Sequence, residues 1–403
     1  MSASFHEMWA DLRPIGRDGG TGGYHRYAWT GADADCRAWF RAQATARGMT
    51  YETDRNGNQW AHLGDPTAGD AVALGSHLDS VPSGGAFDGP LGVVSSFAAI
   101  DELRRKGAEF TRPVRVANFS DEEGARFGLA CVGSRLAAGA LAPDAARALR
   151  DADGTTLAAA MERAGQDPEA LGPDPERLAR IGAFVELHIE QGRALDLTGD
   201  RIGVASAIWP HGRWRFDFRG EANHAGTTRL EDRRDPMLAY AATVLAARRA
   251  AASAGALATF GKVAVEPNGV NAVPSLVRGW LDSRAADHTT LEALVTAVEQ
   301  AASESAAQEG TTVDVVRESF SPEVSFGAGL RDTLVELLNG AVPVLPTGAG
   351  HDAGILSGTL PSAMLFVRNP TGTSHSPAEN AAEDDCTAGV TALADVLEGL
   401  ACA

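Results

Sequence analysis

The chain has 403 residues, of which 44% are hydrophobic, 22% charged and 6% aromatic. This is the profile of a globular protein of roughly two domains, and the 45 glycines and 19 prolines show no collagen-like period. Because 53 acidic residues outnumber 35 basic ones, the net charge is −18, and such a polyanion would repel a nucleic acid. Lysine occurs only at Lys106 and Lys262, neither in a context that suggests covalent catalysis.

The cysteines and the N-terminal segment bear on the cellular compartment. The four cysteines are scattered and form no CxxC pair, which favours a reducing environment: Cys36, Cys131, Cys386 and Cys402. The N-terminal segment lacks the basic and apolar regions of a signal peptide, and no run of about 18 apolar residues occurs. We therefore expect a cytoplasmic protein that does not contact a membrane.

Apolar spacing and turn residues predict an α/β pattern in the first half of the chain. The expected elements are a helix at 31–48, two short strands within 51–63, a strand at 71–74, a helix at 92–106, and strands at 114–119, 183–188 and 202–208. Strand, helix and strand in this order favour a parallel sheet.

The pattern changes near residue 209. Strands are expected at 213–219, 263–272, 276–282 and 312–316, with helices at 236–252 and 291–307. Alternating strands with two helices predict a compact α+β domain with an antiparallel sheet. Strands near 345 and at 363–367 and a helix at 387–400 then return to the first pattern. We therefore predict an α/β protein with a mixed, mostly parallel sheet, in which residues 209–324 are inserted into a catalytic domain formed by 1–208 and 325–403.

The densest polar cluster begins where the strand at 71–74 ends. His77 and Asp79 are two residues apart on an extended segment, so their side chains share a face, and Asp88 follows in a glycine-rich loop that can fold back. A histidine with two carboxylates suits a divalent metal. Ordinary turn formation by the aspartates is the alternative.

Three further strand ends carry similar side chains. Glu122 and Glu123 are adjacent carboxylates that a nearby cation would hold together, one as ligand and the other as general base; an acidic helix start is the alternative. Glu186, His188 and Glu190 share one face of a strand end, and His375 lies in a loop before the last helix. Each segment alone also suits a structural role, but their recurrence at four ends of one sheet favours a metal site.

Competing motifs are weak. The chain has no Gly-x-Ser-x-Gly elbow and no P-loop. Residues 348–353 match a relaxed dinucleotide-binding pattern, but Pro343 and Pro346 interrupt the preceding apolar run. We expect this segment to line the metal site rather than to bind a nucleotide in an oxidoreductase.

Together, these motifs resemble the hydantoinase/carbamoylase branch of the dinuclear-metal aminoacylase and carboxypeptidase superfamily. The resemblance spans nearly the whole chain and rests on residues 22–30, 75–92, 121–127, 186–192, 223–228, 271–274, 348–353 and 374–379.

The resemblance implies two divalent ions, Zn²⁺, Mn²⁺ or Co²⁺. His77 and His188 would hold one ion, Glu123 and His375 the other, and Asp88 both. Asp79 would orient His77. Glu122 would be the general base that activates water and protonates the leaving nitrogen.

The resemblance also implies substrate groups in the inserted domain. His224 would stabilise the oxyanion, while Asn271 and Arg284 would bind substrate, the arginine through a carboxylate. Gln191 and His351 are further candidates to line the pocket. A homodimer that forms through the inserted domain and shares groups across subunits is expected.

Three segments depart from the family pattern. Pro210 and His211 stand where relatives carry a glycine and then a glutamine, so His211 is expected to alter the pocket. Arg229 replaces a proline and is expected to lie on the surface. Arg368 is either a second anion contact or a loop cation.

The predicted activity is hydrolysis of the ureido C–N bond of a small carboxylate. The candidate substrates are allantoate and an N-carbamoyl-L-amino acid, with a preference for allantoate. One alternative is an aminoacylase or dipeptidase that cleaves an N-acyl amino acid. Another is a non-catalytic metal-binding relative, against which the presence of the base Glu122 argues.

Overall fold

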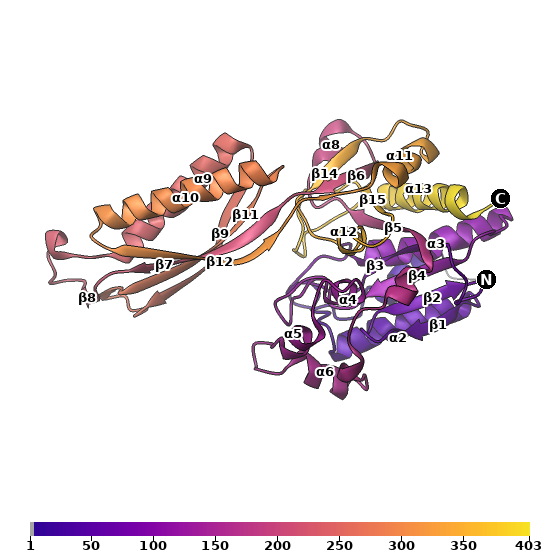
Figure 1. The fold of residues 1–403 in the computed structure, drawn as a ribbon, viewed down its shortest axis with the longest axis horizontal. Helices are drawn as coiled ribbons and strands as arrows, with labels where there is room; N and C mark the ends of the chain where they lie inside the picture. Colours follow the sequence, from indigo (N-terminus) through magenta and orange to yellow (C-terminus); the bar gives the residue numbers. More distant parts are fainter. Residues whose placement is uncertain (1–3) are drawn as a thin grey trace. The chain divides into compact units, whose positions relative to one another are not determined.

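The computed structural model describes residues 4–403, and the chain divides into two compact units (Figure 1). The larger unit comprises the chain up to Ser206 and resumes at Ser325 to end at Ala403. The smaller unit comprises Ala207–Val324. The chain therefore leaves the larger unit once, builds the smaller one and returns.

The larger unit is built on a mixed sheet. Over residues 4–403 this sheet has nine strands in the order β1-β2-β4-β3-β5-β15-β6-β13, with β14 paired to β6. The strands are β1 (Thr50–Thr53), β2 (Gln59–Leu63), β3 (Ala71–His77), β4 (Val114–Phe119), β5 (Ile181–Ile189), β6 (Ile202–Ile208), β13 (Val324–Ser325), β14 (Val344–Thr347) and β15 (Ser362–Val367). The four central strands β4, β3, β5 and β15 are parallel, whereas β1 and β2 on one side and β6 on the other pair antiparallel. The predicted α/β class is confirmed.

Helices surround this sheet. They are α1 (Phe5–Leu12), α2 (Gly31–Ala46), α3 (Pro90–Lys106), α4 (Val132–Ala137), α5 (Pro143–Ala148), α6 (Leu157–Arg163), α7 (Pro175–Leu178), α8 (Ala194–Thr198), α11 (Ala328–Leu337), α12 (Asp352–Leu356) and α13 (Glu383–Ala401), with a 3₁₀ turn η1 (Pro168–Ala170). Sequence analysis predicted α2, α3 and α13. It missed the short helices between residues 132 and 178, because segments of one or two turns show too little of a 3.6-residue period.

Helix α3 anchors the core beneath the strand ends. It begins with Pro90, which is preorganised for a first helical position, and ends at Gly107, whose φ of 78° suits a residue without Cβ. The helix packs against β3, β5 and α13, and its Phe97 and Ile100 are fully buried with Leu187 and Leu393. This packing fixes the central strands, and with them the side chains at their carboxyl ends.

The smaller unit is an antiparallel sheet covered by two long helices. Its strand order, within the described chain, is β12-β7-β11-β9, and β8 and β10 form a separate two-stranded ladder. The elements are β7 (His211–Arg219), β8 (Asn223–His224), η2 (Leu230–Asp232), α9 (Pro236–Ala254), β9 (Leu257–Glu266), β10 (Ala272–Val273), β11 (Leu276–Arg284), α10 (His288–Gln308) and β12 (Thr312–Ser321). Both helices start after an aspartate cap, Asp235 and Asp287. The predicted α+β architecture is confirmed.

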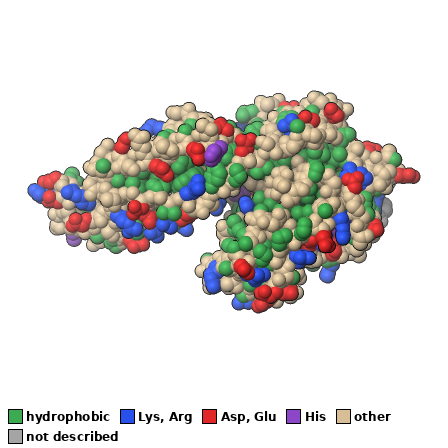
Figure 2. Space-filling model, in the orientation of Figure 1, with side chains coloured by type: hydrophobic (Ala, Val, Ile, Leu, Met, Phe, Trp, Pro, Cys, Tyr) green, Lys and Arg blue, Asp and Glu red, His purple; other side chains and the backbone are tan. Residues whose placement is uncertain are grey.

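The two faces of the smaller sheet differ in chemistry. Phe216, Phe218 and Leu281 point into the core under α9 and α10. On the other face, Asp217 lies among arginines and accepts hydrogen bonds from Arg278 at 2.7 and 3.2 Å. Acidic and basic side chains are correspondingly interspersed over the strands β7 and β12 in Figure 2. Arg229, as expected, is exposed, and it pairs with Asp232.

Two observations bear on the compartment. No helix within residues 4–403 is long and apolar enough to cross a membrane. All four cysteines are free thiols, and three of them are buried.

Candidate metal centre

Polar side chains converge at one edge of the large sheet. Because β3, β4, β5 and β15 are parallel, their carboxyl ends meet there. The structure brings together the five residues that the sequence nominated as metal ligands: His77, Asp88, Glu123, His188 and His375. His77 is the last residue of β3 and His188 lies in β5, whereas the other three come from loops.

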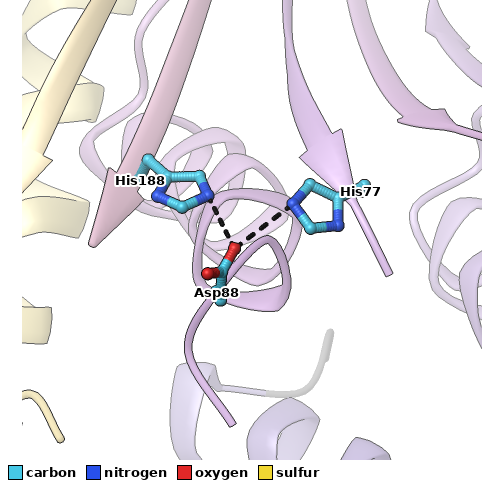
Figure 3. A group of neighbouring side chains, drawn as sticks. All are labelled: His77, Asp88 and His188. Atoms are coloured by element: carbon cyan, nitrogen blue, oxygen red, sulfur yellow. Dashed lines mark ion pairs between the residues drawn. The ribbon is translucent and has the colours of Figure 1, made fainter. Parts of the chain in front are cut away.

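Asp88 lies between two groups of ligands, and each of its oxygens faces one group. Its Oδ1 lies 3.2 Å from Nε2 of His188 and 3.5 Å from Nε2 of His77 (Figure 3). Its Oδ2 lies 3.4 Å from Nε2 of His375, which is itself 3.6 Å from Oε2 of Glu123. This is the arrangement in which one carboxylate can bridge two cations.

The two inner histidines present their free nitrogens to this carboxylate. Nδ1 of His188 contacts the backbone oxygen of Ile189 at 2.8 Å, and Nδ1 of His77 contacts that of Asp79 at 3.2 Å. A carbonyl accepts only an N–H, so Nδ1 carries a proton in each ring and Nε2 is the nitrogen that is left to face Asp88. In the described structure neither Nε2 makes a hydrogen bond, although both are buried. Unpartnered imidazole nitrogens facing a carboxylate fit a divalent metal.

The two halves of the site differ in exposure. The side chains of His77 and His188 are 1% and 0% exposed, whereas that of His375 is 50% exposed. The glycine-rich loop closes over the inner half: Gly89, with φ of 82°, lies against the His77 ring where any Cβ would collide. The outer half opens to solvent.

Asp79 ties two strand-end loops together. Its carboxylate accepts the backbone N–H groups of Glu122 at 3.2 Å and Glu123 at 3.0 Å, and its Oδ1 also lies 3.4 Å from Nδ1 of His77. The sequence predicted only the contact with His77. Asp79 therefore fixes both the histidine and the pair of glutamates.

Glu122 faces the inner half of the site. Its Oε2 lies 3.6 Å from Nε2 of His77, and its Oε1 accepts a hydrogen bond from Sγ of Cys131 at 3.2 Å. Sequence analysis missed Cys131, which has a left-handed backbone with φ of 57° and whose amide also binds the Glu122 carbonyl at 2.6 Å. No local pattern marks such a residue, because the contact depends on the turn.

Burial and like charge shift the pKa values of the cluster. Burial raises the pKa of Glu122 well above its ordinary value, and burial with Asp88 nearby raises the pKa of Glu123 to about 7. For Asp88, burial is outweighed by His188, His375 and His77, which hold its pKa well below the usual range. The bond to Asp88 raises the pKa of His375 to about 9. Within residues 4–403 these carboxylates form ion pairs with histidines but none with Lys or Arg, and such a buried acidic cluster favours a bound cation.

The segment at 348–353 lines this site, as predicted. The His351 ring centroid is 4.5 Å from that of His188, and burial holds the pKa of His351 well below its ordinary value, so the ring is neutral. The Ala353 amide at the start of α12 binds Glu186 at 2.9 Å. The Glu186 carboxylate therefore lies at the N-terminus of α12, which is the position that the phosphates of a bound dinucleotide would take. This contact argues against dinucleotide binding.

Gln191 also lies at the site. Its Nε2 donates to Oδ2 of Asp88 at 2.8 Å and contacts Ser374 at 3.2 Å and His375 at 3.4 Å. Arg368, by contrast, is a loop cation: it makes two 2.9 Å hydrogen bonds to the Asp385 carboxylate.

The substrate-binding candidates of the smaller unit occupy two separate places. His224 pairs with Ala272 in the β8–β10 ladder, and the carbonyl of neighbouring Asn271 accepts the Ala225 amide. His211 and Arg284 face each other at the opposite end of β7 and β11. With about 3.3 Å per residue along β11, the two places are roughly 25 Å apart, so the structure does not gather these four residues.

The contacts of His211 and Arg284 are also defined. Nδ1 of His211 contacts the Trp209 carbonyl oxygen at 3.1 Å. Arg284 donates to the Asp282 carboxylate at 2.8 and 3.2 Å. An anionic ligand that binds Arg284 would therefore compete with Asp282 for the guanidinium group, or bind beside it.

Comparisons with known proteins agree with this geometry. The chain is 34% identical to an N-carbamoyl-L-amino acid amidohydrolase of Geobacillus stearothermophilus, covering 96% of each chain, and 34% identical to an allantoate amidohydrolase of Escherichia coli (strain K12), covering 94% of this chain and 93% of that one. The crystal structure of a hydantoinase/carbamoylase family amidase from Burkholderia vietnamiensis superposes with a TM-score of 0.86 at 29% identity, over 100% of this chain and 98% of that chain. The model of Peptidase family M20/M25/M40 matches residues 73–399. The resemblance seen in the sequence is confirmed, and the chain is an enzyme that belongs to the hydrolase family M20/M25/M40.

Proposed function

We propose that this protein is a metal-dependent amidohydrolase that cleaves the ureido C–N bond of a small carboxylate. The observation that carries the proposal is the position of Asp88, with one oxygen facing His77 and His188 and the other facing His375. Relatives named as N-carbamoyl-L-amino acid and allantoate amidohydrolases support a ureido substrate.

In this proposal the ligands divide as the geometry suggests. His77 and His188 would hold one ion, Glu123 and His375 would hold the other, and Asp88 would contribute to both. The set contains imidazoles and carboxylates but no thiolate, which suits Zn²⁺, Mn²⁺ or Co²⁺. Two such ions would lower the pKa of the attacking water and polarise the scissile carbonyl.

Glu122 serves as the general base. Its Oε2 faces the inner ligands, while the thiol of Cys131 holds Oε1. Burial raises its pKa, which suits a carboxyl group that takes a proton from water and then delivers it to the leaving nitrogen. Asp79 positions both residues, because its carboxylate accepts the backbone N–H of Glu122 and lies beside Nδ1 of His77.

The proposed substrate contacts are the remaining candidates of the sequence analysis. Gln191 and His351 line the ligand cluster, and His351, being neutral, offers an uncharged polar edge. Arg284 binds the substrate carboxylate with Asn271 and His211 contributing, and His224 stabilises the oxyanion. We favour allantoate over an N-carbamoyl-L-amino acid.

The distance between His224 and Arg284 supports a homodimer. A small carboxylate cannot contact two groups roughly 25 Å apart on one rigid sheet. We therefore propose that a complete site draws on the smaller units of two subunits.

Mixing variants tests this sharing. Glu122→Gln and His224→Ala are each expected to be inactive alone. In a mixed C₂ dimer one of the two sites regains both groups, and about half of the dimers in a randomly exchanged 1:1 mixture are mixed, so the mixture should regain about one quarter of the wild-type activity. No recovery, with mixed dimers demonstrated by mass spectrometry, would place His224 and Glu122 of one subunit in the same site.

The reaction is tested by ammonia release from a panel of allantoate, N-carbamoyl-L-methionine and N-carbamoyl-β-alanine, each with Mn²⁺ or Zn²⁺ and after chelation. An N-acetyl amino acid, followed by an amine assay, represents the alternative aminoacylase or dipeptidase activity. Metal-dependent release from one ureido acid would establish the proposal. Turnover of the acetyl compound alone would favour the aminoacylase or dipeptidase activity. No turnover of any compound by a protein that holds two ions would favour a non-catalytic relative.

A further inference from the structure

Glu379 connects the loop of Asp88 to the loop of His375. Its Oε1 accepts the backbone N–H groups of Phe87 at 2.8 Å and Asp88 at 3.0 Å. Glu379 is 5% exposed and lies four residues after His375 in the chain. One buried carboxylate therefore spans two loops that are almost 300 residues apart in the sequence.

Ser374 extends this link to the ligand itself. Its hydroxyl lies 3.1 Å from Oδ2 of Asp88 and 3.4 Å from Oε2 of Glu379. The bonded oxygen Oδ2 is the one that faces His375. The orientation of the Asp88 carboxylate thus depends on Glu379 through its own backbone amide and through Ser374.

The surroundings leave Glu379 little freedom. Gly85 lies so close that a Cβ there would collide with the Glu379 side chain. The two backbone hydrogen bonds and this close contact hold the Glu379 carboxylate against the loop of Asp88.

We propose that Glu379 is a positioning residue that locks Asp88 Oδ2 and His375 into the geometry for the second, outer divalent ion. This inference rests on the metal assignment of the proposed function. The inner ligands depend on Glu379 less, because His77 and His188 stand on strands and their Nδ1 atoms are held by backbone oxygens. The outer ligand His375 comes from an exposed loop.

Three variants separate hydrogen bonding from bulk and charge. Glu379→Gln keeps an oxygen for the two amides and offers Ser374 an N–H, so it should retain the link. Glu379→Ala removes the link. Gly85→Ala keeps the Glu379 carboxyl group in the protein, but its methyl group would collide with Oε1, Cδ and Cβ of Glu379, so this side chain must shift. Glu383→Ala, at an exposed glutamate of the same segment, is the matched control.

The readout is the number of bound ions and their affinity. After desalting with Mn²⁺ or Zn²⁺, the wild type, Glu379→Gln and Glu383→Ala should hold two ions per subunit by elemental analysis. Glu379→Ala should hold one, with the second ion bound about 10- to 100-fold more weakly in competition with a chromophoric chelator. Gly85→Ala should also lose the second ion selectively.

The outcomes distinguish this inference from the proposed function. A wild type that binds fewer than two ions would overturn the metal assignment, and this inference with it. Folded Glu379→Ala and Gly85→Ala proteins that hold two ions with wild-type affinity would overturn the inference alone. If circular dichroism shows that Glu379→Ala does not fold, Gly85→Ala decides, because it retains the buried carboxyl group. Equal weakening of both ions would also contradict a selective role.

Discussion

The edge of the large sheet and the polar face of the small sheet shift the pKa values of their buried carboxyl groups by different means. On the small sheet, Asp217 is surrounded by Arg278, Arg215 and Arg219, which lower its pKa. At the large sheet edge, Glu122 and Glu123 are buried without Lys or Arg contacts among the interactions described, and their pKa values rise. One region neutralises its own acidic charge with arginines, whereas in the proposed function the other would have its acidic charge neutralised by bound cations.

The strongest test of this contrast concerns Glu122. We expect Glu122→Gln to lower kcat by about 10²- to 10⁴-fold, because the amide cannot accept the proton of the attacking water. The variant should still hold two ions, since Glu122 is not among the proposed ligands. Turnover of the preferred ureido acid and elemental analysis check both parts. A kcat within tenfold of wild type at full metal content would remove Glu122 from the role of base.

The second largest expected effect is that of metal removal on the free energy of unfolding. In the proposed function the folded cluster binds the ions and the unfolded chain does not, so metal at a thousand times Kd should stabilise the larger unit by about 4 kcal/mol for each ion bound. Urea unfolding with and without a chelator measures this difference. The difference should become smaller in His188→Ala, which lacks a ligand of the inner ion but keeps those of the outer one. A chelator effect of equal size in that variant would point to binding elsewhere.

The sequence could predict which residues lie together where their positions follow from neighbouring segments of the chain. His77, Asp88, Glu122, Glu123, His188 and His375 all follow or end predicted segments, and parallel strands bring such positions to one edge. Long helices such as α3 and α10 were predictable because many turns repeat one apolar period. The role of Glu379 was not predictable, because the backbone groups that it binds are almost 300 residues away in the chain. Nor does a local pattern reveal that His224 and Arg284 lie at opposite ends of one sheet.

On the small sheet, the largest expected loss follows Asp217→Asn. Removing this charge leaves three arginines facing a neutral amide, and Asp217 is only 7% exposed. We expect a loss of about 1–2 kcal/mol of unfolding free energy, since the arginines remain partly hydrated. The loss should be the same with and without a chelator. The control is Asp314→Asn, an exposed neighbour 3.6 Å from Arg219, which should change nothing measurable. A chelator-dependent loss would mean that the two regions are coupled.

The smallest effect is a pH dependence at a paired carboxylate of the larger unit. Glu52 contacts Nε2 of His62 at 2.9 Å and also pairs with Arg177, and the bond to His62 followed by that to Arg177 lowers its pKa to about 2. A lowered folded pKa stabilises the fold above the ordinary value of 4.5, and this contribution disappears as the pH falls toward 2. Because the Glu52 side chain is 40% exposed, solvent screening limits the contribution to about 1 kcal/mol or less. The difference in unfolding free energy between wild type and Glu52→Gln, measured with urea, should therefore be largest at pH 7 and should shrink as the pH falls from 4.5 toward 2. A difference that grows as the pH falls would show that Glu52 is stabilised as the neutral acid, as Glu122 and Glu123 are.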